Sequence, residues 1–473
     1  MSGAGAPITG EVAIVGAGPT GAMLAILLRR RGMNIAVYES RADPRAAEGE
    51  AGRSINLALA DRGINALKRI GVYEEVRRET VPMRGRLIHE PGGGTTLLPY
   101  GRRSDEVIYS ISRRRLNQVL IDIAVRRHGV PVKFEHRLES VDLGANVARI
   151  RDLGADRLRQ VPMQPLLACD GAGSLLRREL AQIRVIEADE RLLTHGYKEL
   201  SIPAGIESGR RLARDVLHIW PRGGYMLIAL PNLDGSFTAT LFLDQSSFAS
   251  LTEPAVIERF LAESFPDVLD LMPEHTAEFL NHPTGSLGTV HAAPWHYGDT
   301  AALIGDSAHA IVPFHGQGMN CCFEDCLEFD AAVGRHDTWE ARFDDFYRAR
   351  KPNTEAIAAM ALDNYLEMRE RVADPGFRLQ QSLSLELERR FPARFVPRYA
   401  MVMFHHEIPY AVALRRGEFQ SRLLQDLTAG ATSLRDIDFD QARREIERHL
   451  APIHSASIDG ASASVEGDER IGD

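Results

Sequence analysis

The stretch EVAIVGAGPTGAMLAILLRRRGMNIAVYES, residues 11–40, decides the fold of this 473-residue chain. It begins with a short β-branched strand and passes through a glycine turn into an amphipathic helix, which Gly32 closes. A second strand follows and ends at Glu39. This order of elements is a βαβ unit, so the sequence predicts an α/β domain built around a parallel sheet.

The glycine turn in this unit has the pattern G-x-G-x-x-G, formed by Gly16, Gly18 and Gly21. In such a turn the first glycine permits the tight bend, the second lets a pyrophosphate approach the backbone, and the third lets helix and strand pack closely. Glu39 follows Gly21 by 18 residues, where a carboxylate can bind ribose hydroxyls. A purely structural turn is the alternative, but the βαβ setting and the acid favour a bound dinucleotide that contains adenine.

The composition is that of a soluble globular protein, with 44% hydrophobic and 26% charged residues, long enough for two domains that share a core. The formal net charge of −9 leaves no basic surface for nucleic acid. Three of the four cysteines crowd at 321, 322 and 326, unlike the spaced framework of a secreted protein. No apolar run reaches the roughly 18 to 20 residues that cross a bilayer. We therefore expect a cytoplasmic protein with no nucleic-acid partner and no membrane attachment.

The pattern of the chain changes along its length. Residues 81–101 read as two strands joined by a Pro-Gly-Gly-Gly turn, and residues 197–243 are again rich in strands. We predict a nucleotide-binding domain over 8–80, 102–185 and 296–335, with a substrate-binding β-sheet domain over 81–101 and 186–295 inserted into it. A helical region over 336–454 and a disordered, polar tail over 455–473 complete the prediction.

Two further motifs lie far from the first. Asp170-Gly171 ends an apolar run in CDGAGSLLRREL, residues 169–180, and alone would be an ordinary β-turn. Gly305-Asp306 stands at the tip of an expected strand in LIGDSAHAIVPFHGQGMN, residues 303–320, and Pro313 and a glycine-rich turn follow it.

With these three motifs together, the chain resembles the single-component FAD-dependent aromatic hydroxylases, whose fingerprints are G-x-G-x-x-G, Asp-Gly, and Gly-Asp followed by a proline. The segments GRSINLALADRG, HGYKELSIP, AIVPFHGQGMNCCFEDC and DNYLEM narrow the resemblance to the members that act on L-kynurenine. They lie between residue 52 and about residue 368. The resemblance implies an α/β fold: a Rossmann-like FAD-binding domain, an inserted antiparallel substrate sheet and a C-terminal helical region.

The resemblance also implies the cofactors. NADPH, or NADH, would reduce a bound FAD. Asp306 would accept hydrogen bonds from the ribityl hydroxyls, and the turn at 315–320 would lie against the isoalloxazine ring. The residues expected to contact FAD are Gly16, Gly18, Gly21, Glu39, Arg53, Arg113, Asp170, Gly305, Asp306, Gly318, Met319 and Asn320.

The implied reaction transfers one oxygen atom of O2 to the ring carbon of L-kynurenine that lies ortho to its amino group. Arg86, Tyr100 and Asn364 would hold the substrate carboxylate, with Tyr410 as a further contact. The catalytic pocket beside the flavin would be lined by Pro313, Phe314 and His315. Without the resemblance, Arg86 reads as a surface ion pair, the two tyrosines as packing aromatics and Asn364 as an exposed amide.

Several alternatives remain at this point. The same chemistry could act on a ring-substituted kynurenine or another aminated aromatic, or the chain could bind flavin without catalysis. Ser307 has no G-x-S-x-G elbow around it, so a hydrolase is disfavoured. The crowded cysteines lack a second ligand pair, so no metal is predicted. The sequence leaves the oligomeric state and the preference for NADPH or NADH open.

Overall fold

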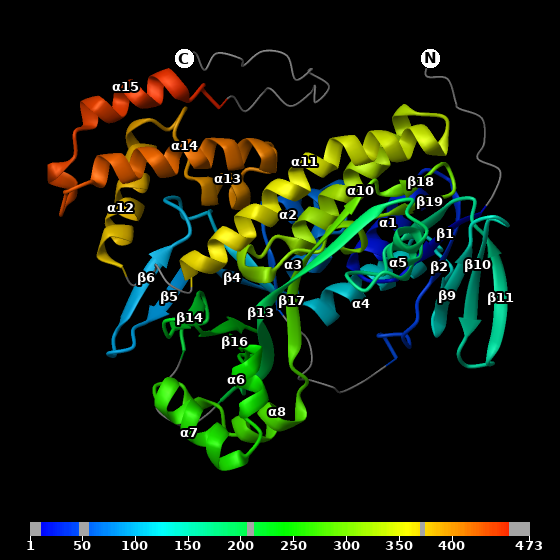
Figure 1. Cartoon of the computed structure of the whole chain (residues 1–473), viewed down its shortest axis with the longest axis horizontal. Helices are drawn as coiled ribbons and strands as arrows, with labels where there is room; N and C mark the ends of the chain where they lie inside the picture. Colours follow the sequence, from blue (N-terminus) through cyan, green and yellow to red (C-terminus); the bar gives the residue numbers. More distant parts are fainter. Residues whose placement is uncertain (1–10, 47–55, 206–211, 369–373, 454–473) are drawn as a thin grey trace. The chain divides into compact units, whose positions relative to one another are not determined.

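The computed structural model describes residues 11–46, 56–205, 212–368 and 374–453. Contacts along the chain divide it into two units, Met1–Asp374 and Pro375–Asp473. The first unit holds the nucleotide-binding domain and the inserted sheet, and the second is helical (Figure 1).

The nucleotide-binding domain is organised around a six-stranded sheet in the order β18-β19-β12-β1-β2-β8. β1 pairs in parallel with β2 on one side and with β12 on the other, so the chain order reverses at β1. The carboxyl edge of such a reversal point is where open α/β sheets bind ligands. The strands are β1 (Glu11–Val15), β2 (Asn34–Tyr38), β8 (Val132–Lys133), β12 (Leu166–Ala168), β18 (His296–Tyr297) and β19 (Ala301–Leu303).

Helices and two smaller sheets surround this sheet. The predicted helix after the glycine turn is α1, whose residues 21–28 are all buried. Helix α4 begins after Ser112, and the Ser112 hydroxyl caps it by accepting the Arg115 N–H. The helices are α1 (Pro19–Arg30), α2 (Asp61–Arg69), α3 (Tyr73–Arg77), α4 (Arg113–Arg126), α5 (Leu175–Gln182), α9 (Asp306–His309), α10 (Gly318–Arg335) and α11 (Trp339–Leu366). The smaller sheets consist of β3 (Asn56–Leu59), β4 (Thr80–Met83) and β7 (Ile108–Ser112), and of β9 (His136–Asp142), β10 (Val147–Asp152) and β11 (Arg157–Pro162).

The inserted sheet has seven strands in the order β17-β13-β16-β15-β14-β5-β6. Residues 81–101 contribute β5 and β6, which join strands that lie more than 100 residues later. All neighbouring pairs are antiparallel except β14 and β5, which run parallel with Leu217 opposite Arg86. The strands are β5 (Gly85–His89), β6 (Thr95–Pro99), β13 (Glu187–Ile202), β14 (Leu217–Pro221), β15 (Met226–Pro231), β16 (Phe237–Asp244) and β17 (Gly285–Ala293).

The two faces of this sheet pack against different parts of the chain. One face builds a core around Trp220 and Phe265 with helices α6 (Gln245–Ser250), α7 (Pro254–Ser264) and α8 (His275–Asn281). The other face packs Phe242 against Phe314 and Tyr365, which come from the segment after α9 and from α11. This second core places the Gly305-Asp306 segment and α11 against the inserted sheet.

The second unit contains the remaining helices, whose apolar faces meet around Leu383, Leu387, Phe395 and Ile446. They are α12 (Pro375–Arg390), α13 (Arg398–Phe404), α14 (Tyr410–Thr428) and α15 (Phe439–His449). The helical region predicted over 336–454 is thus divided, because α11 buries Phe343 and Phe346 in the core of the first unit. The predicted tail over 455–473 lies outside the described residues. Among the helices described, none is long and apolar enough to span a membrane.

Candidate flavin and substrate site

The glycine turn after β1 is closely packed on one side and open on the other. Gly16 has φ +96°, and an added Cβ would overlap the carbonyl oxygen of Cys169. At Gly21 an added Cβ would overlap the carbonyl oxygen of Gly16. A Cβ on Gly18, in contrast, would meet nothing within 4 Å. The turn therefore leaves room for a ligand at Gly18, whereas Gly16 and Gly21 are in close contact with backbone atoms and admit no side chain.

The helix that follows this turn presents an uncapped N-terminus. Gly18 provides no side-chain cap for α1, and the first turn of α1 contains no acidic residue. Backbone N–H groups at such an end attract an anion. At the tip of β2, Glu39 is buried and accepts the Ala17 N–H at 2.8 Å. Burial opposes ionisation of Glu39, but hydrogen bonds from Arg41 and Ala17 outweigh it and hold its pKa below the usual range, so a carboxylate acceptor is present there.

The turn after β12 contributes a second carboxylate. One oxygen of Asp170, Oδ2, accepts the Leu175 N–H at 2.9 Å. The other, Oδ1, is buried and has no hydrogen-bond partner among the described residues. Burial raises the pKa of this carboxyl group. A buried acceptor without a donor at the ligand-binding edge of the sheet fits a hydroxyl group of a bound nucleotide.

Arg177 joins this turn to the third one. Its buried guanidinium donates from Nη1 to the Ser307 carbonyl at 2.8 Å and from Nη2 to the Ala172 carbonyl. The third turn begins at Gly305, which has φ +70°, and Asp306 starts the single-turn helix α9. Asp306 Oδ1 accepts a weak hydrogen bond from the Cys322 thiol at 3.4 Å. The structure thus brings the second and third motifs together through one cation.

The glycine-rich turn that leads into α10 is held by Asn320, which is fully buried. Its Nδ2 donates to the carbonyls of Ala58 at 2.8 Å and Gly316 at 2.9 Å, and its Oδ1 accepts the Ala60 N–H at 3.0 Å. The Asn320 side chain therefore ties the turn to the segment between β3 and α2. Gly318 and Met319 lie in the first turn of α10, whose N-cap residue provides no side-chain cap.

These features fit FAD: open space at Gly18, uncapped N-termini on α1 and α10, and an acceptor without a donor at Asp170. Two arginines are also expected at the cofactor. Arg113 begins α4 on the surface, where its charge acts on Tyr197 and Glu199 of β13. Arg53 lies outside the described residues.

The expected substrate arginine is distinguished from its neighbour by burial. The Arg86 side chain is only 10% exposed; its Nη1 lies 3.8 Å from Glu367 Oε1, and its guanidinium lies 5.8 Å from the centre of the buried Tyr100 ring. The Arg84 side chain is 58% exposed and pairs with Asp215 at 2.6 Å. The surface ion pair that the sequence allowed for Arg86 is thus found at Arg84.

Asn364 is buried on α11, not exposed in mid-helix as its type alone suggests. Its Nδ2 donates to the Phe314 carbonyl at 2.6 Å. Phe314 stacks on Tyr365 with 4.2 Å between ring centres and packs on Phe242 at 5.0 Å. The first unit therefore assembles the turn at 313–315, with His315 also buried, next to the sheet that carries Arg86. Tyr410 is buried at the start of α14 in the second unit.

Glu367 was missed by the sequence reasoning. It follows Asn364 by three residues in DNYLEM, and residues at that spacing share a helix face, so the pattern contained the signal. The opposite ion-pairing partner, Arg86, is 281 positions away in the sequence. Only the folded chain shows the two charges together.

A group of potential metal ligands, His309, Cys321 and Asp325, also lies near α10. The guanidinium of Arg350 already binds two of the three residues, because it donates to Asp325 Oδ1 at 2.7 Å and lies 3.3 Å from the Cys321 sulfur. Burial raises the pKa of Cys321, which disfavours a thiolate ligand. This group is a side-chain network and does not fit a metal ion.

Comparison with known proteins agrees with this architecture. Residues 9–330 match the family model described as an FAD binding domain. The kynurenine 3-monooxygenase of Stenotrophomonas maltophilia is 48% identical over 94% of this chain and 98% of its own length, and that of Myxococcus xanthus is 42% identical over 95% and 97%. In fold, the chain is similar to 2-methyl-3-hydroxypyridine-5-carboxylic acid oxygenase, with a TM-score of 0.64 and 16% identity over 80% of this chain and 98% of the other. This chain belongs to the kynurenine 3-monooxygenase family of FAD-dependent monooxygenases.

Proposed function

We propose that this chain hydroxylates L-kynurenine to 3-hydroxykynurenine with bound FAD, NADPH and O2. The observation that carries the proposal is the buried Arg86, which lies beside Tyr100 and Glu367 at the edge of the apolar core around Phe314. An amino-acid substrate with an aromatic ring requires this combination of charged and apolar surface. The relatives named above support the same substrate.

Arg86 and Glu367 suit the two charges of an amino acid. In the structure the two side chains lie 3.8 Å apart and compensate each other. A substrate could bind with its carboxylate on Arg86 and its ammonium group on Glu367, so that both charged side chains keep a partner of opposite sign. Tyr100 would add a hydroxyl donor to the carboxylate.

The aromatic ring of the substrate would lie against the apolar core that contains Phe242, Phe314 and Tyr365. Asn364 holds the backbone of this wall through its bond to the Phe314 carbonyl, so it acts on the shape of the pocket in addition to any contact with substrate. A closed apolar wall also excludes water from the reacting ring. When bound, FAD reduced by NADPH supplies the activation of O2.

For the cofactor itself, the pyrophosphate would occupy the open space at Gly18 and the N-terminus of α1. Glu39, Asp170 and Asp306 would accept hydrogen bonds from its hydroxyl groups. We further place the enzyme in the cytoplasm, because its four cysteines are free and buried, as a reducing compartment would keep them.

The test is NADPH oxidation by the purified yellow protein under air, with and without L-kynurenine, with both 3-hydroxykynurenine and H2O2 quantified. We expect stimulated oxidation with stoichiometric product. Stimulation that yields mainly H2O2 would instead indicate a ring-substituted kynurenine as the substrate. No stimulation would contradict the proposal.

The variant Arg86→Met tests the carboxylate site, with Arg84→Met, two residues earlier in the sequence, as the matched control. Removing a charge-assisted pair costs about 2 to 4 kcal/mol of binding, so KM for L-kynurenine should rise roughly 30-fold or more. FAD affinity should not change, and Arg84→Met should resemble the parent. Equal effects of the two variants would refute the assignment of Arg86.

A further inference from the structure

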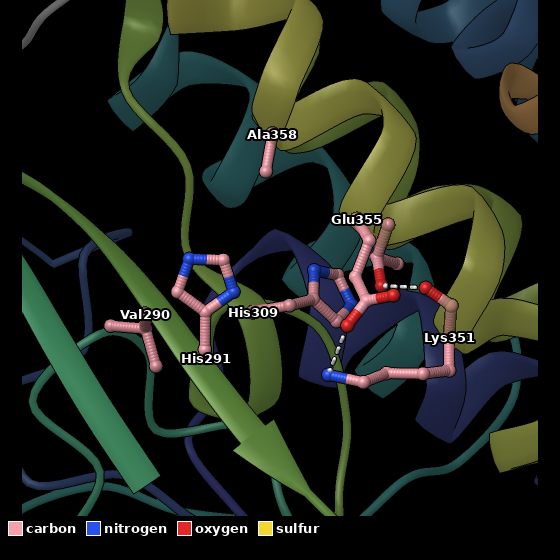
Figure 2. Close-up of a pocket in the computed structure, with 7 residues that line it drawn as sticks. Val290, His291, His309, Lys351, Glu355 and Ala358 are labelled. Carbon is pink, nitrogen blue, oxygen red and sulfur yellow. Dashed lines mark hydrogen bonds and ion pairs between the residues drawn. The ribbon is translucent and has the colours of Figure 1, made fainter. Parts of the chain in front are cut away.

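The crevice drawn in Figure 2 lies between β17 and α11 and leads to His309, the last residue of α9. The polar groups on its α11 side are already paired: Lys351 binds Glu355 at 3.0 Å and the Ala292 carbonyl at 3.0 Å. The crevice therefore has little polar capacity left for a ligand on that side. His309, which also lines the crevice, shares its helical turn with Asp306.

His309 begins a network of ionisable side chains. Its Nε2 donates to Asp325 Oδ2 at 2.6 Å, and Asp325 Oδ1 accepts from Arg350 Nε at 2.7 Å. Burial opposes ionisation of Asp325, but His309 and Arg350 outweigh it and hold its pKa below the usual range. Arg350 continues to Glu324 at 3.2 Å, and Glu324 pairs with Arg62 at 2.7 Å. The network connects α9 to α10, α11 and α2.

Helix α9, which ends at His309, is too short to be stable by itself. α9 has four residues, and a single helical turn is unstable in isolation because its nucleation costs more than its few hydrogen bonds return. Its place must come from side-chain anchors. Ser307 provides one, since its hydroxyl donates to the Ala168 carbonyl at 2.5 Å and accepts the Ile304 N–H at 3.1 Å. The bond from His309 to Asp325 provides another, on the side of α10.

A general contribution to the free energy of folding does not explain the network from His309 to Arg62 well. Buried ion pairs return little net stability relative to apolar residues of similar size, because removing charges from water is expensive. What directional, charge-assisted bonds do provide is a fixed geometry. Here the geometry that they fix is the position of α9 against α10, the helix whose first turn contains Gly318 and Asn320.

We propose that His309, held by Asp325, is a positioning residue that keeps the Asp306 turn in place and thereby sets the affinity for FAD. The inference rests on the assignment of Asp306 to FAD in the proposed function. It predicts that removing the His309 donor moves Asp306 without altering any residue that contacts the substrate.

FAD is first stripped from the purified protein. The FAD dissociation constant is then measured by fluorescence while the apoprotein is titrated with FAD. His309→Phe keeps a ring that can pack on Trp295, whose ring centre lies 4.9 Å from that of His309, but loses the donor. We expect FAD affinity to fall about 10-fold or more. His309→Gln, whose amide can replace the Nε2 donor, should recover most of it. KM for L-kynurenine at saturating FAD should stay within about twofold of the parent in both variants.

The matched control is His291→Phe, the same substitution in the wall of the same crevice, and it should leave FAD affinity unchanged. Parental FAD affinity in folded His309→Phe would overturn the inference, and so would equal losses in the Phe variants at 291 and 309 or a failure of His309→Gln to recover binding. If His309→Phe does not fold, His309→Asn takes its place, because its amide is too short to span the same distance. Asp306→Ala separates the two hypotheses: if that variant binds FAD normally, the assignment of Asp306 itself is wrong.

Discussion

The guanidinium of Arg177 donates a 2.8 Å hydrogen bond to the carbonyl of Ser307, 130 positions away in the sequence. The same guanidinium donates to the Ala172 carbonyl, in the turn that follows β12. A single buried cation thus holds the Asp170-Gly171 turn and the Gly305-Asp306 turn together. In a fold that binds its ligand at the carboxyl edge of the sheet, such a link fixes two sides of the site relative to each other.

Arg177→Met should therefore affect both folding and FAD binding. It leaves the Ser307 carbonyl buried without its donor, which costs about 1 to 3 kcal/mol of unfolding free energy. FAD affinity should fall by about tenfold, since two turns are released. Urea unfolding of the apoprotein and FAD titration measure the two effects. Arg178→Met is the control, because Arg178 is exposed and donates to the nearby Gly173 carbonyl; if this variant weakens FAD binding equally, the link through Arg177 is not the cause.

Gly18 and Gly21 should respond differently to alanine. Gly18 has φ −64° and open space around an added Cβ, so Gly18→Ala should fold with an unfolding free energy within about 0.5 kcal/mol of the parent. Its methyl group would occupy space next to the pyrophosphate and weaken FAD binding. Gly21→Ala places a Cβ against backbone and should cost about 3 kcal/mol or more. Undiminished FAD affinity in Gly18→Ala would place the pyrophosphate elsewhere.

The variant Glu367→Gln tests whether Glu367 exchanges its ion pair with Arg86 for one with the ammonium group of the substrate. Losing a hydrogen bond to a charged group costs about 1.5 to 3 kcal/mol, so KM for L-kynurenine should rise roughly 10- to 100-fold. A substrate analogue without the α-amino group should not distinguish the variant from the parent. Glu355→Gln, on the same helix, removes a pair with Lys351 and serves as the control. If KM for the analogue differs between the variant and the parent as much as KM for L-kynurenine does, Glu367 does not bind the ammonium group.

The buried His218 should make the protein less stable in acid. Burial lowers its pKa from 6.5 to about 4, and its ring lies between the Ala213 carbonyl and His89. Because the folded-state pKa lies below the unfolded one, protonation favours unfolding. The contribution of His218 is complete above about pH 6.5 and is lost as the pH falls toward 4.

The measurement is urea unfolding of the apoprotein at pH 7 and pH 4.5. The shift in the pKa of His218 corresponds to a loss of about 2 kcal/mol over this interval. His218→Asn, which cannot titrate there, should lose correspondingly less between the two pH values. An identical loss in parent and variant would show that other groups govern the acid response.

Much of the nucleotide-binding domain could be predicted because its signals are local. The βαβ unit and the contact of Gly21 with Gly16 depend on residues that are close together in the sequence, whereas the contact of Gly16 with Cys169 does not. Each of the three motifs is local, whereas their proximity arises in the folded chain, through Arg177 and the contact of Gly16 with Cys169. The role of Asn320 in holding the turn was beyond this reasoning, because its partners lie near residue 60.

The sequence by itself determined the βαβ unit and the motif positions, because hydrophobic periodicity and glycine spacing are fixed by covalent neighbours, and the family followed from the resemblance that the motifs carry. Only the tertiary structure decided which of Arg84 and Arg86 is buried, since the two are two residues apart on the same side of one segment and the pairing of β5 with β14 sets the surroundings of Arg86. It also decided the partners of Arg177, His309 and Glu367, and the end of the first unit at Asp374. Such pairings join positions that are brought together only when the whole chain closes around its core, and no local pattern specifies them.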